Sequence, residues 1–128
     1  MILGDSTLNV LIHKKAQLVP VSLFKNLRTK FAAFNFPDMD SISILADNVV
    51  PMILIKHGVL ECEQPHTLQS GSKFEVELRA LSIVAGEEIV QATNGAVNCA
   101  ELDYALWVKG KEKEYKDLER HATRTIMY

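Results

Sequence analysis

Three aspartates, Asp38, Asp40 and Asp47, lie within ten residues of one another in the segment FPDMDSISILADN. Carboxylates serve enzymes as nucleophiles, as general acids or bases, and as anions that stabilise a developing positive charge. The elements that hold them decide between these roles, because helix ends, burial and neighbouring charges set the ionisation of each carboxylate.

Asp38 and Asp40 are predicted to stand at the start of a helix. Pro37 favours an extended conformation for the residue before it, and Asp40 is a residue type that caps helices. Asp38 then lies just outside the positive end of that helix, where the anion is favoured. An ionised Asp38 suits a nucleophile or a stabiliser of positive charge. The alternative, an ordinary loop and cap pair, is the more frequent one for such residues.

Asp47 is predicted to lie inside a buried helix over residues 41–58. The segment SISILADNVVPMILIKHG is apolar on both faces, and Gly58 suits the position just after a helix. Pro51 has no N–H for the Asp47 carbonyl, so a kink is expected there. A carboxylate beside freed backbone groups is a candidate site, although a solvated or ion-paired Asp47 is an equally frequent alternative.

The other segments are also predicted to be helical. A helix is expected to begin at Asp5 or Ser6 and to end or kink at Pro20, and a second amphipathic piece follows over residues 23–31. The strongest helical pattern runs over residues 73–92.

A short helix around Trp107 is expected after the strongest one, with Trp107 in the core. The segment KGKEKEYKDLERH, residues 109–121, is too charged to be core.

Composition indicates one domain over residues 1–128, because a chain with 48% hydrophobic residues can bury one core. A net charge of −2 disfavours binding to nucleic acid. Apolar runs are shorter than the ~20 residues of a membrane span. Cys62 and Cys99 lack metal-type spacing, so a cytoplasmic protein without a metal is expected.

Five blocks of the sequence resemble, in the same order, blocks of the queuosine salvage protein family, the queuosine 5′-phosphate N-glycosylase/hydrolases. The blocks here are HKKAQL, FPDMDSISILADN, GSKFEVELRALSIVA, LDYALW and HATRTIMY. The family versions are approximately Y-K-R-A-Q, F-x-D-x-x-x-I-T-x-F-A-D, E-V-E-I-R-A, L-D-x-x-L-W and H-R-T-R-T-I-Y-Y. The resemblance covers nearly the whole chain, but only the C-terminal part of a typical family member.

The resemblance implies an all-α fold related in architecture to helical DNA glycosylases, here a partial version of a larger fold. It implies hydrolysis of the N-glycosidic bond of queuosine 5′-monophosphate to release queuine, without a cofactor or a metal. The family's catalytic aspartate falls on Asp38, whose anion would stabilise positive charge on the ribose anomeric carbon. This agrees with the interpretation of Asp38 as an ionised carboxylate.

The resemblance also implies a set of substrate-binding residues. Asp47 is expected to hold substrate hydroxyls or to orient Asp38. Lys14 and Lys15 are candidates for the 5′-phosphate, although a solvated helix face explains them slightly better. Asp103 is expected to accept hydrogen bonds from the base or its cyclopentenediol side chain.

The Glu75–Arg79 pair lies in the third block and is explained at least as well by an ion-pair network that fixes helix packing.

Two alternatives to an enzyme remain open on the sequence. Half of a nucleotide pocket binds weakly, so the site is expected to need an N-terminal portion supplied by a partner, or self-association to cover apolar faces. A non-catalytic helical interaction module without a complete pocket is the first alternative. A helical nucleic-acid binder is the second, and the mild acidity of the chain is evidence against it.

Overall fold

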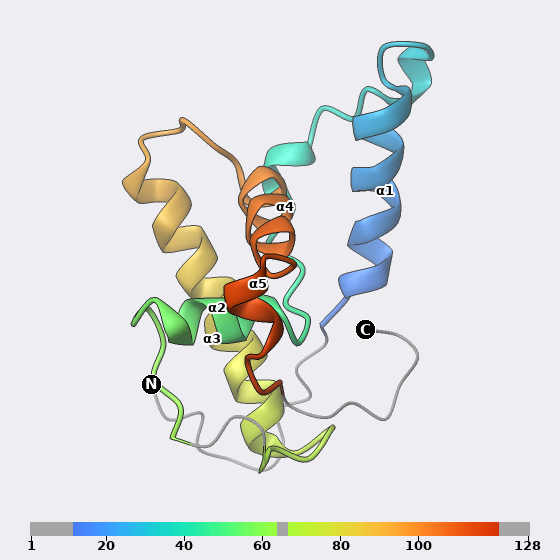
Figure 1. The fold of residues 1–128 in the computed structure, drawn as a ribbon. Helices are drawn as coiled ribbons and strands as arrows, with labels where there is room; N and C mark the ends of the chain where they lie inside the picture. The colour runs from blue at the N-terminus through green and yellow to red at the C-terminus, as the bar shows by residue number, and fades with distance from the viewer. Residues whose placement is uncertain (1–11, 64–66, 121–128) are drawn as a thin grey trace.

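The computed structural model describes residues 12–63 and 67–120, and every regular element in these ranges is a helix. The predicted all-α class is confirmed, whereas the relation to helical DNA glycosylases stays a prediction. Figure 1 shows α2, α3 and α4 gathered together, with α1 standing beside them. No helix in the described ranges is long and apolar enough to cross a membrane. The predicted helix start at Asp5 or Ser6 and the HATRTIMY block lie outside the described residues.

The longest helix, α3, spans Lys73–Ala92, as its single apolar stripe predicts. Ser72 caps it, since its side chain accepts a hydrogen bond from the Glu75 N–H. The next helix, α4, spans Cys99–Lys109 and begins with a capping box formed by Asn98 and Glu101. Both helices pack against α2, Val50–Lys56, and against each other.

The predicted buried helix over residues 41–58 is wrong in its first half. Residues 42–47 adopt no regular structure, and α2 has only seven residues. Pro51 lies in the first turn of α2, where the missing N–H breaks no intrahelical hydrogen bond, so it produces no kink at Asp47. The predicted stop is confirmed, because Gly58 follows the helix with a φ of 71°.

Asp40 does not cap a helix, contrary to the prediction. It lies within η2, a 3₁₀ helix of three residues, Met39–Ser41. Asp38 precedes η2 and makes no side-chain cap hydrogen bond. So short an element has little dipole, so the predicted interaction of Asp38 with the positive end of a helix is absent.

The first described helix, α1, spans Lys14–Leu27 and continues through Pro20. Of the two predicted effects of Pro20, an end or a kink, the end is therefore wrong. Pro20 cannot donate to the carbonyl of Ala16, but Ala16 is exposed and water can serve that carbonyl. None of the α1 residues is buried, and α1 packs mainly against η1, the 3₁₀ helix Ala32–Phe34 that follows it. Two polar contacts tie α1 to the residues before α2, namely Lys14–Asp47 and Gln17–Ser43.

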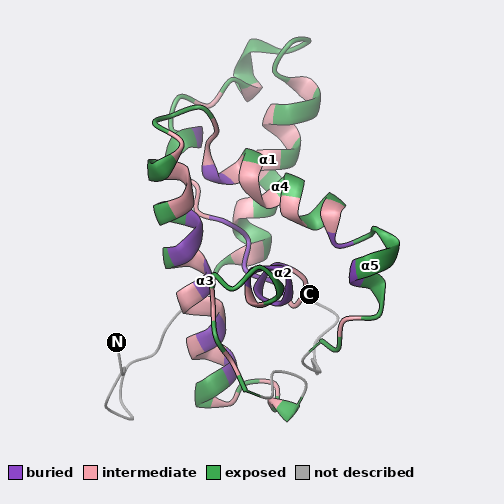
Figure 2. Cartoon of the chain, turned by 60° about the vertical axis from the view of Figure 1, so that its left-hand side comes forward, coloured by how far each residue is buried: buried purple, intermediate pink, exposed green. Residues whose placement is uncertain are grey.

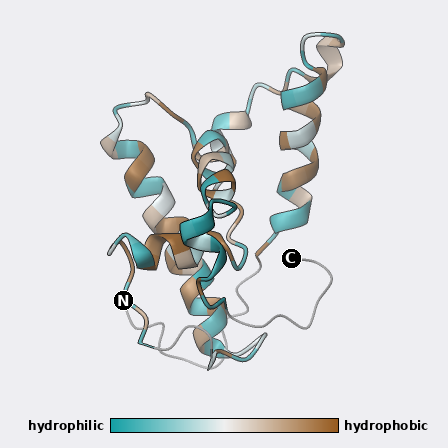
Figure 3. Ribbon diagram, viewed as in Figure 1, coloured by the Kyte–Doolittle hydropathy of each residue, from teal (hydrophilic) through white to brown (hydrophobic). Residues whose placement is uncertain are grey.

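The core forms where residues 44–54 lie against α3 and α4. Its buried members are Ile44, Val50, Leu54, Ala85 and Cys99. Figure 2 shows the burial concentrated in α2 and on one side of α3, and Figure 3 shows that α2 is predominantly hydrophobic.

The charged segment after α4 also contributes to the interior, contrary to prediction. Tyr115, in α5 (Lys113–Lys116), is 2% exposed, and its hydroxyl lies 2.9 Å from Nε2 of His57.

Gly86 allows α3 to lie close to residues 42–47, the irregular segment before α2. A Cβ atom built at this position would lie 2.8 Å from side-chain carbons of the buried Ile44. We therefore predict that Gly86→Ala destabilises the fold by about 1–3 kcal/mol through overpacking. Glu88→Ala, on the exposed side of the same helix, is the matched control and should change the free energy of unfolding by less than about 0.5 kcal/mol. Urea unfolding of both variants measures this, and equal stability would contradict the packing described here.

Candidate functional site

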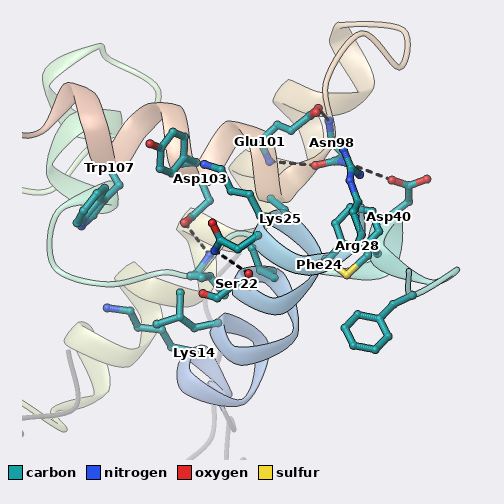
Figure 4. Close-up of a pocket in the computed structure, with 18 of the residues that line it drawn as sticks. Lys14, Ser22, Phe24, Lys25, Arg28, Asp40, Asn98, Glu101, Asp103 and Trp107 are labelled. Carbon is teal, nitrogen blue, oxygen red and sulfur yellow. Dashed lines mark hydrogen bonds between the residues drawn. The ribbon is translucent and has the colours of Figure 1, made fainter. Parts of the chain in front are cut away.

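A cavity of about 1010 Å³ lies between α1 and α4. Its walls come from α1, from residues 35–37, 39 and 40, from Leu45 and Asp47, and from α4 with the preceding Asn98. Figure 4 shows side chains from these elements converging on one space. Cations, carboxylates and aromatic rings all line it, which suits a ligand that combines an anionic group with a flat ring system.

Lys14 and Asp47 form an ion pair at one end of the cavity. Lys14 Nζ lies 3.5 Å from Asp47 Oδ2, and the two side chains are 14% and 9% exposed. Asp47 Oδ1 accepts hydrogen bonds from the N–H groups of Val49 and Val50, at 2.7 and 2.9 Å. The ion-paired alternative for Asp47 is therefore the one that the structure shows, and its carboxylate also caps the start of α2.

Asp103, from α4, lies in the same wall and holds the irregular segment. Its Oδ1 accepts a hydrogen bond from the Leu45 N–H at 2.8 Å. Burial raises the pKa of Asp103 to about 6; the Leu45 N–H opposes this rise, the Asp47 charge adds to it, and Lys14 opposes it. Near neutral pH such a group both gains and loses a proton easily, so Asp103 is suited to donate a proton or to accept a hydrogen bond.

An aromatic pair on α4 forms another part of the wall. Tyr104 and Trp107 line the cavity with their ring centroids 6.3 Å apart. Lys25 Nζ lies 3.1 Å from the Tyr104 ring centroid, and Lys111 Nζ lies 3.1 Å from that of Trp107. Trp107 is 41% exposed, so the prediction that it belongs to the core is wrong.

Tyr104 and Lys25 also line the cavity, although the sequence did not predict them as site residues. The spacing of Tyr104 and Trp107, three residues apart on a helix, was a signal that they share a face.

The structure brings four of the five predicted site residues to this cavity. Lys14, Lys15, Asp47 and Asp103 line it, and Lys15 is exposed. Asp38 does not line it. Its side chain is exposed, while its two neighbours, Pro37 and Met39, are lining residues.

Asp40 is the carboxylate that the structure places in the cavity wall beside Asp38. Its Oδ1 accepts a hydrogen bond from Asn98 Nδ2 at 3.2 Å, which joins η2 to the start of α4. Within the described residues, no three His, Cys, Asp or Glu side chains are grouped as a metal ion requires.

Comparison with known proteins identifies the family. A family model described as "Queuosine salvage protein" matches residues 5–128. The chain belongs to the queuosine salvage protein family. This confirms the resemblance that the five sequence blocks predict.

Curated members of the queuosine salvage family are longer than this chain. The chain is 29% identical to the queuosine 5′-phosphate N-glycosylase/hydrolase of Sphaerobacter thermophilus, over 93% of its own length and 40% of that protein. The Mus musculus protein of the same name is also 29% identical, over 93% of the chain and 41% of the relative. The Schizosaccharomyces pombe protein is 34% identical over 63% of the chain and 26% of the relative. The chain thus spans about 40% of the length of the first two.

The raised pKa of Asp103 predicts a pH-dependent stability that an amide would remove. An unfolded aspartate has a pKa of about 3.9, whereas folded Asp103 keeps its proton up to about pH 6. The folded state therefore binds more protons between these values, and the native protein loses stability as pH rises through them. Asp103→Asn keeps an acceptor for the Leu45 N–H and loses no proton.

The free energy of unfolding of the Asp103→Asn variant, relative to that of the native chain, should therefore rise by up to about 3 kcal/mol between pH 4 and pH 7. Chemical unfolding at several pH values measures the difference. A difference that does not change with pH would contradict the burial of Asp103 in this wall.

Proposed function

We propose that this chain provides one part of a site that hydrolyses the N-glycosidic bond of queuosine 5′-monophosphate and releases queuine. The observation that carries the proposal is that Lys14, Lys15, Asp47, Asp103 and the Tyr104–Trp107 pair all line one cavity. The names of the family relatives, queuosine 5′-phosphate N-glycosylase/hydrolases, support the same substrate. A nucleotide has an anionic phosphate, polar hydroxyls and a flat base, and each has a chemically suitable partner in this wall.

In the proposed reaction, one carboxyl group acts as an anion and another supplies a proton or a hydrogen bond. Departure of the base leaves positive charge on the anomeric carbon of the ribose, and a carboxylate close to that carbon stabilises it. The leaving base needs a proton or a hydrogen-bond donor, which Asp103 can supply because its pKa is about 6. When ionised, Asp103 instead accepts hydrogen bonds from the base or its cyclopentenediol.

Asp38 is the proposed catalytic anion, on the strength of its match to the F-x-D block. It lies between two residues that line the cavity, Pro37 and Met39, and its own side chain is exposed to solvent. Asp47 is proposed to orient the ribose hydroxyls from its position at the start of α2, where two backbone N–H groups hold its Oδ1.

Lys14 and Lys15 are proposed to bind the 5′-phosphate. They are adjacent in the first turn of α1 and both line the cavity. Lys15 is the more exposed of the two, and Lys14 already contacts Asp47. We therefore assign the larger share of phosphate recognition to Lys15.

The open form of the site supports the involvement of a further polypeptide portion. The chain spans about 40% of its relatives, and no residue of α1 is buried even though α1 forms one wall of the cavity. An N-terminal portion of the family fold would cover this wall and enclose the substrate. Self-association of the chain is the other arrangement that would cover it.

We predict that Asp38→Asn abolishes queuine release, because an amide cannot stabilise the cationic transition state. The matched control is Asp117→Asn, the same change at an exposed aspartate after α5. Both variants and the native chain are incubated with queuosine 5′-monophosphate, with and without the N-terminal portion of a relative. Free queuine is measured by mass spectrometry.

Release that needs Asp38 but not Asp117 supports the proposed function. Equal release by all three proteins would remove Asp38 from the mechanism and favour Asp40 or Asp103. Absence of both binding and release under every condition would instead favour the non-catalytic interaction module.

A second prediction concerns the phosphate. Lys15→Ala should weaken binding of queuosine 5′-monophosphate about tenfold, the effect of losing one hydrogen bond to a charged group, and should leave binding of the nucleoside queuosine unchanged. Lys73→Ala, at an exposed position that does not line the cavity, is the control. Calorimetric titration with both ligands measures the ratio of affinities, and equal weakening of both ligands would argue against phosphate recognition by Lys15.

A further inference from the structure

The irregular segment before α2 has an unusual need for hydrogen-bond partners. Residues 42–47 belong to no helix and no strand, yet Ile44 to Asp47 are all buried. Backbone N–H and C=O groups that are buried without a partner cost free energy, and regular structure cannot provide partners here. Side chains from the packed helices must therefore do so.

Arg79, on α3, provides the partner for the most buried of these residues. Its Nε–H donates to the carbonyl oxygen of Ala46 at 2.9 Å, and Ala46 is 0% exposed. Ala46 immediately precedes Asp47, whose carboxylate lines the cavity. The guanidinium thus holds the backbone one residue away from a proposed substrate-binding group.

Glu75 holds Arg79 in this orientation. Glu75 Oε1 lies 3.3 Å from Arg79 Nη1, and Oε2 accepts a hydrogen bond from the Gly71 N–H at 3.2 Å. The side chain of Glu75 is 2% exposed. Buried ion pairs of this kind add little net stability, because desolvation offsets the attraction, so a role in defining geometry explains the pair better than a role in stability.

The residues on both sides of Ala46 are linked to two carboxylates of the cavity wall: Leu45 binds that of Asp103, and Asp47 carries the other. The Leu45 N–H donates to Asp103, and Asp47 binds the first N–H groups of α2 and Lys14. The Ala46 carbonyl and the Asp47 N–H belong to one peptide group, so a rotation of that group would change the backbone at Asp47 directly and would shift Leu45 through the dihedral angles of Ala46. Both carboxylates would then lose their present orientation.

We infer that Arg79, held by Glu75, is a positioning residue that sets the orientation of Asp47 and Asp103 by binding the Ala46 carbonyl. The effect on substrate turnover rests on the proposed function, whereas the effect on the two carboxylates does not. The Glu75–Arg79 pair, which the sequence explains as a packing network, therefore serves the cavity as well.

The test compares Arg79→Lys and Arg79→Met with Arg120→Met in the same chain. Arg120 also donates to a backbone carbonyl, that of Gly110, which is outside residues 42–47. Hydrogen exchange of the Leu45 amide, followed by NMR, reports on its bond to Asp103. We expect about tenfold faster exchange of the Leu45 amide in Arg79→Met, because the loss of one hydrogen bond makes local opening easier. Exchange of the Ala85 amide, in the middle of α3, should not change.

The titration of the Asp103 carboxyl carbon gives a second readout. The Leu45 N–H lowers the pKa of Asp103, so loosening that bond should move the pKa above its native value. The charged groups that act on Asp103, Asp47 and Lys14, remain in every variant. Arg79→Lys keeps the positive charge but lacks the planar guanidinium group. It should therefore restore at most part of the native Leu45 exchange rate and of the native Asp103 pKa.

These outcomes separate the inference from the proposed function. Faster Leu45 exchange together with a raised Asp103 pKa supports positioning, whether or not the chain turns over substrate. Native exchange and a native titration in a folded Arg79→Met variant overturn it. If Arg79→Met does not fold, the same two measurements on Arg79→Lys decide, and loss of protection throughout α3 would indicate a role in stability alone.

Discussion

The structure depends on the way in which a buried segment without regular structure satisfies its backbone. Residues 44–47 cross the interior and lead into α2, and their polar groups are met by side chains from the helices around them. Asp103 accepts a hydrogen bond from the Leu45 N–H, and Arg79 donates one to the Ala46 carbonyl. Asp47 accepts hydrogen bonds from the two N–H groups at the start of α2. Because each of these bonds is buried at least in part, removal of either partner would leave a costly unsatisfied group.

The hydrogen bonds that this buried backbone requires also place the side chains of the site. Two of the carboxylates that line the cavity, Asp47 and Asp103, also hold the segment, so the same atoms serve the fold and the proposed substrate site. Asp103 is kept partly in its acid form by burial, and Asp47 is held between Lys14 and the start of α2. The opposite wall, α1, is attached through polar contacts rather than buried apolar residues, which agrees with a chain that spans about 40% of its relatives.

The sequence predicts best where one pattern has one structural meaning. Residues 73–92 have a single apolar stripe and a serine cap, and α3 has those bounds. Residues 41–58 are apolar on both faces, and a buried irregular segment followed by a short helix gives the same pattern as one long buried helix. Pro51 is compatible with both, since proline ends a helix interior but is tolerated in a first turn.

The site was predictable to the extent that it follows from the sequence blocks. Lys14, Lys15, Asp47 and Asp103 are 89 residues apart at the extremes of the set, and local periodicity alone does not bring them together. Their match to family blocks predicts the grouping, and all four line the cavity. The predicted helix end beside Asp38 was wrong because it assumed a full helix after this residue, where the chain forms only η2. The burial of Tyr115 could not be predicted from its sequence neighbours, because most of them are charged.

The most direct test of this account is a titration of the chain with queuosine 5′-monophosphate, with the backbone amides followed by NMR. The account predicts that the largest shifts occur at Leu45, Val49 and Val50, whose N–H groups bind the two cavity carboxylates, and at the α4 residues around Tyr104. Shifts confined to other surfaces, or none at millimolar nucleotide with and without the N-terminal portion of a relative, would contradict it.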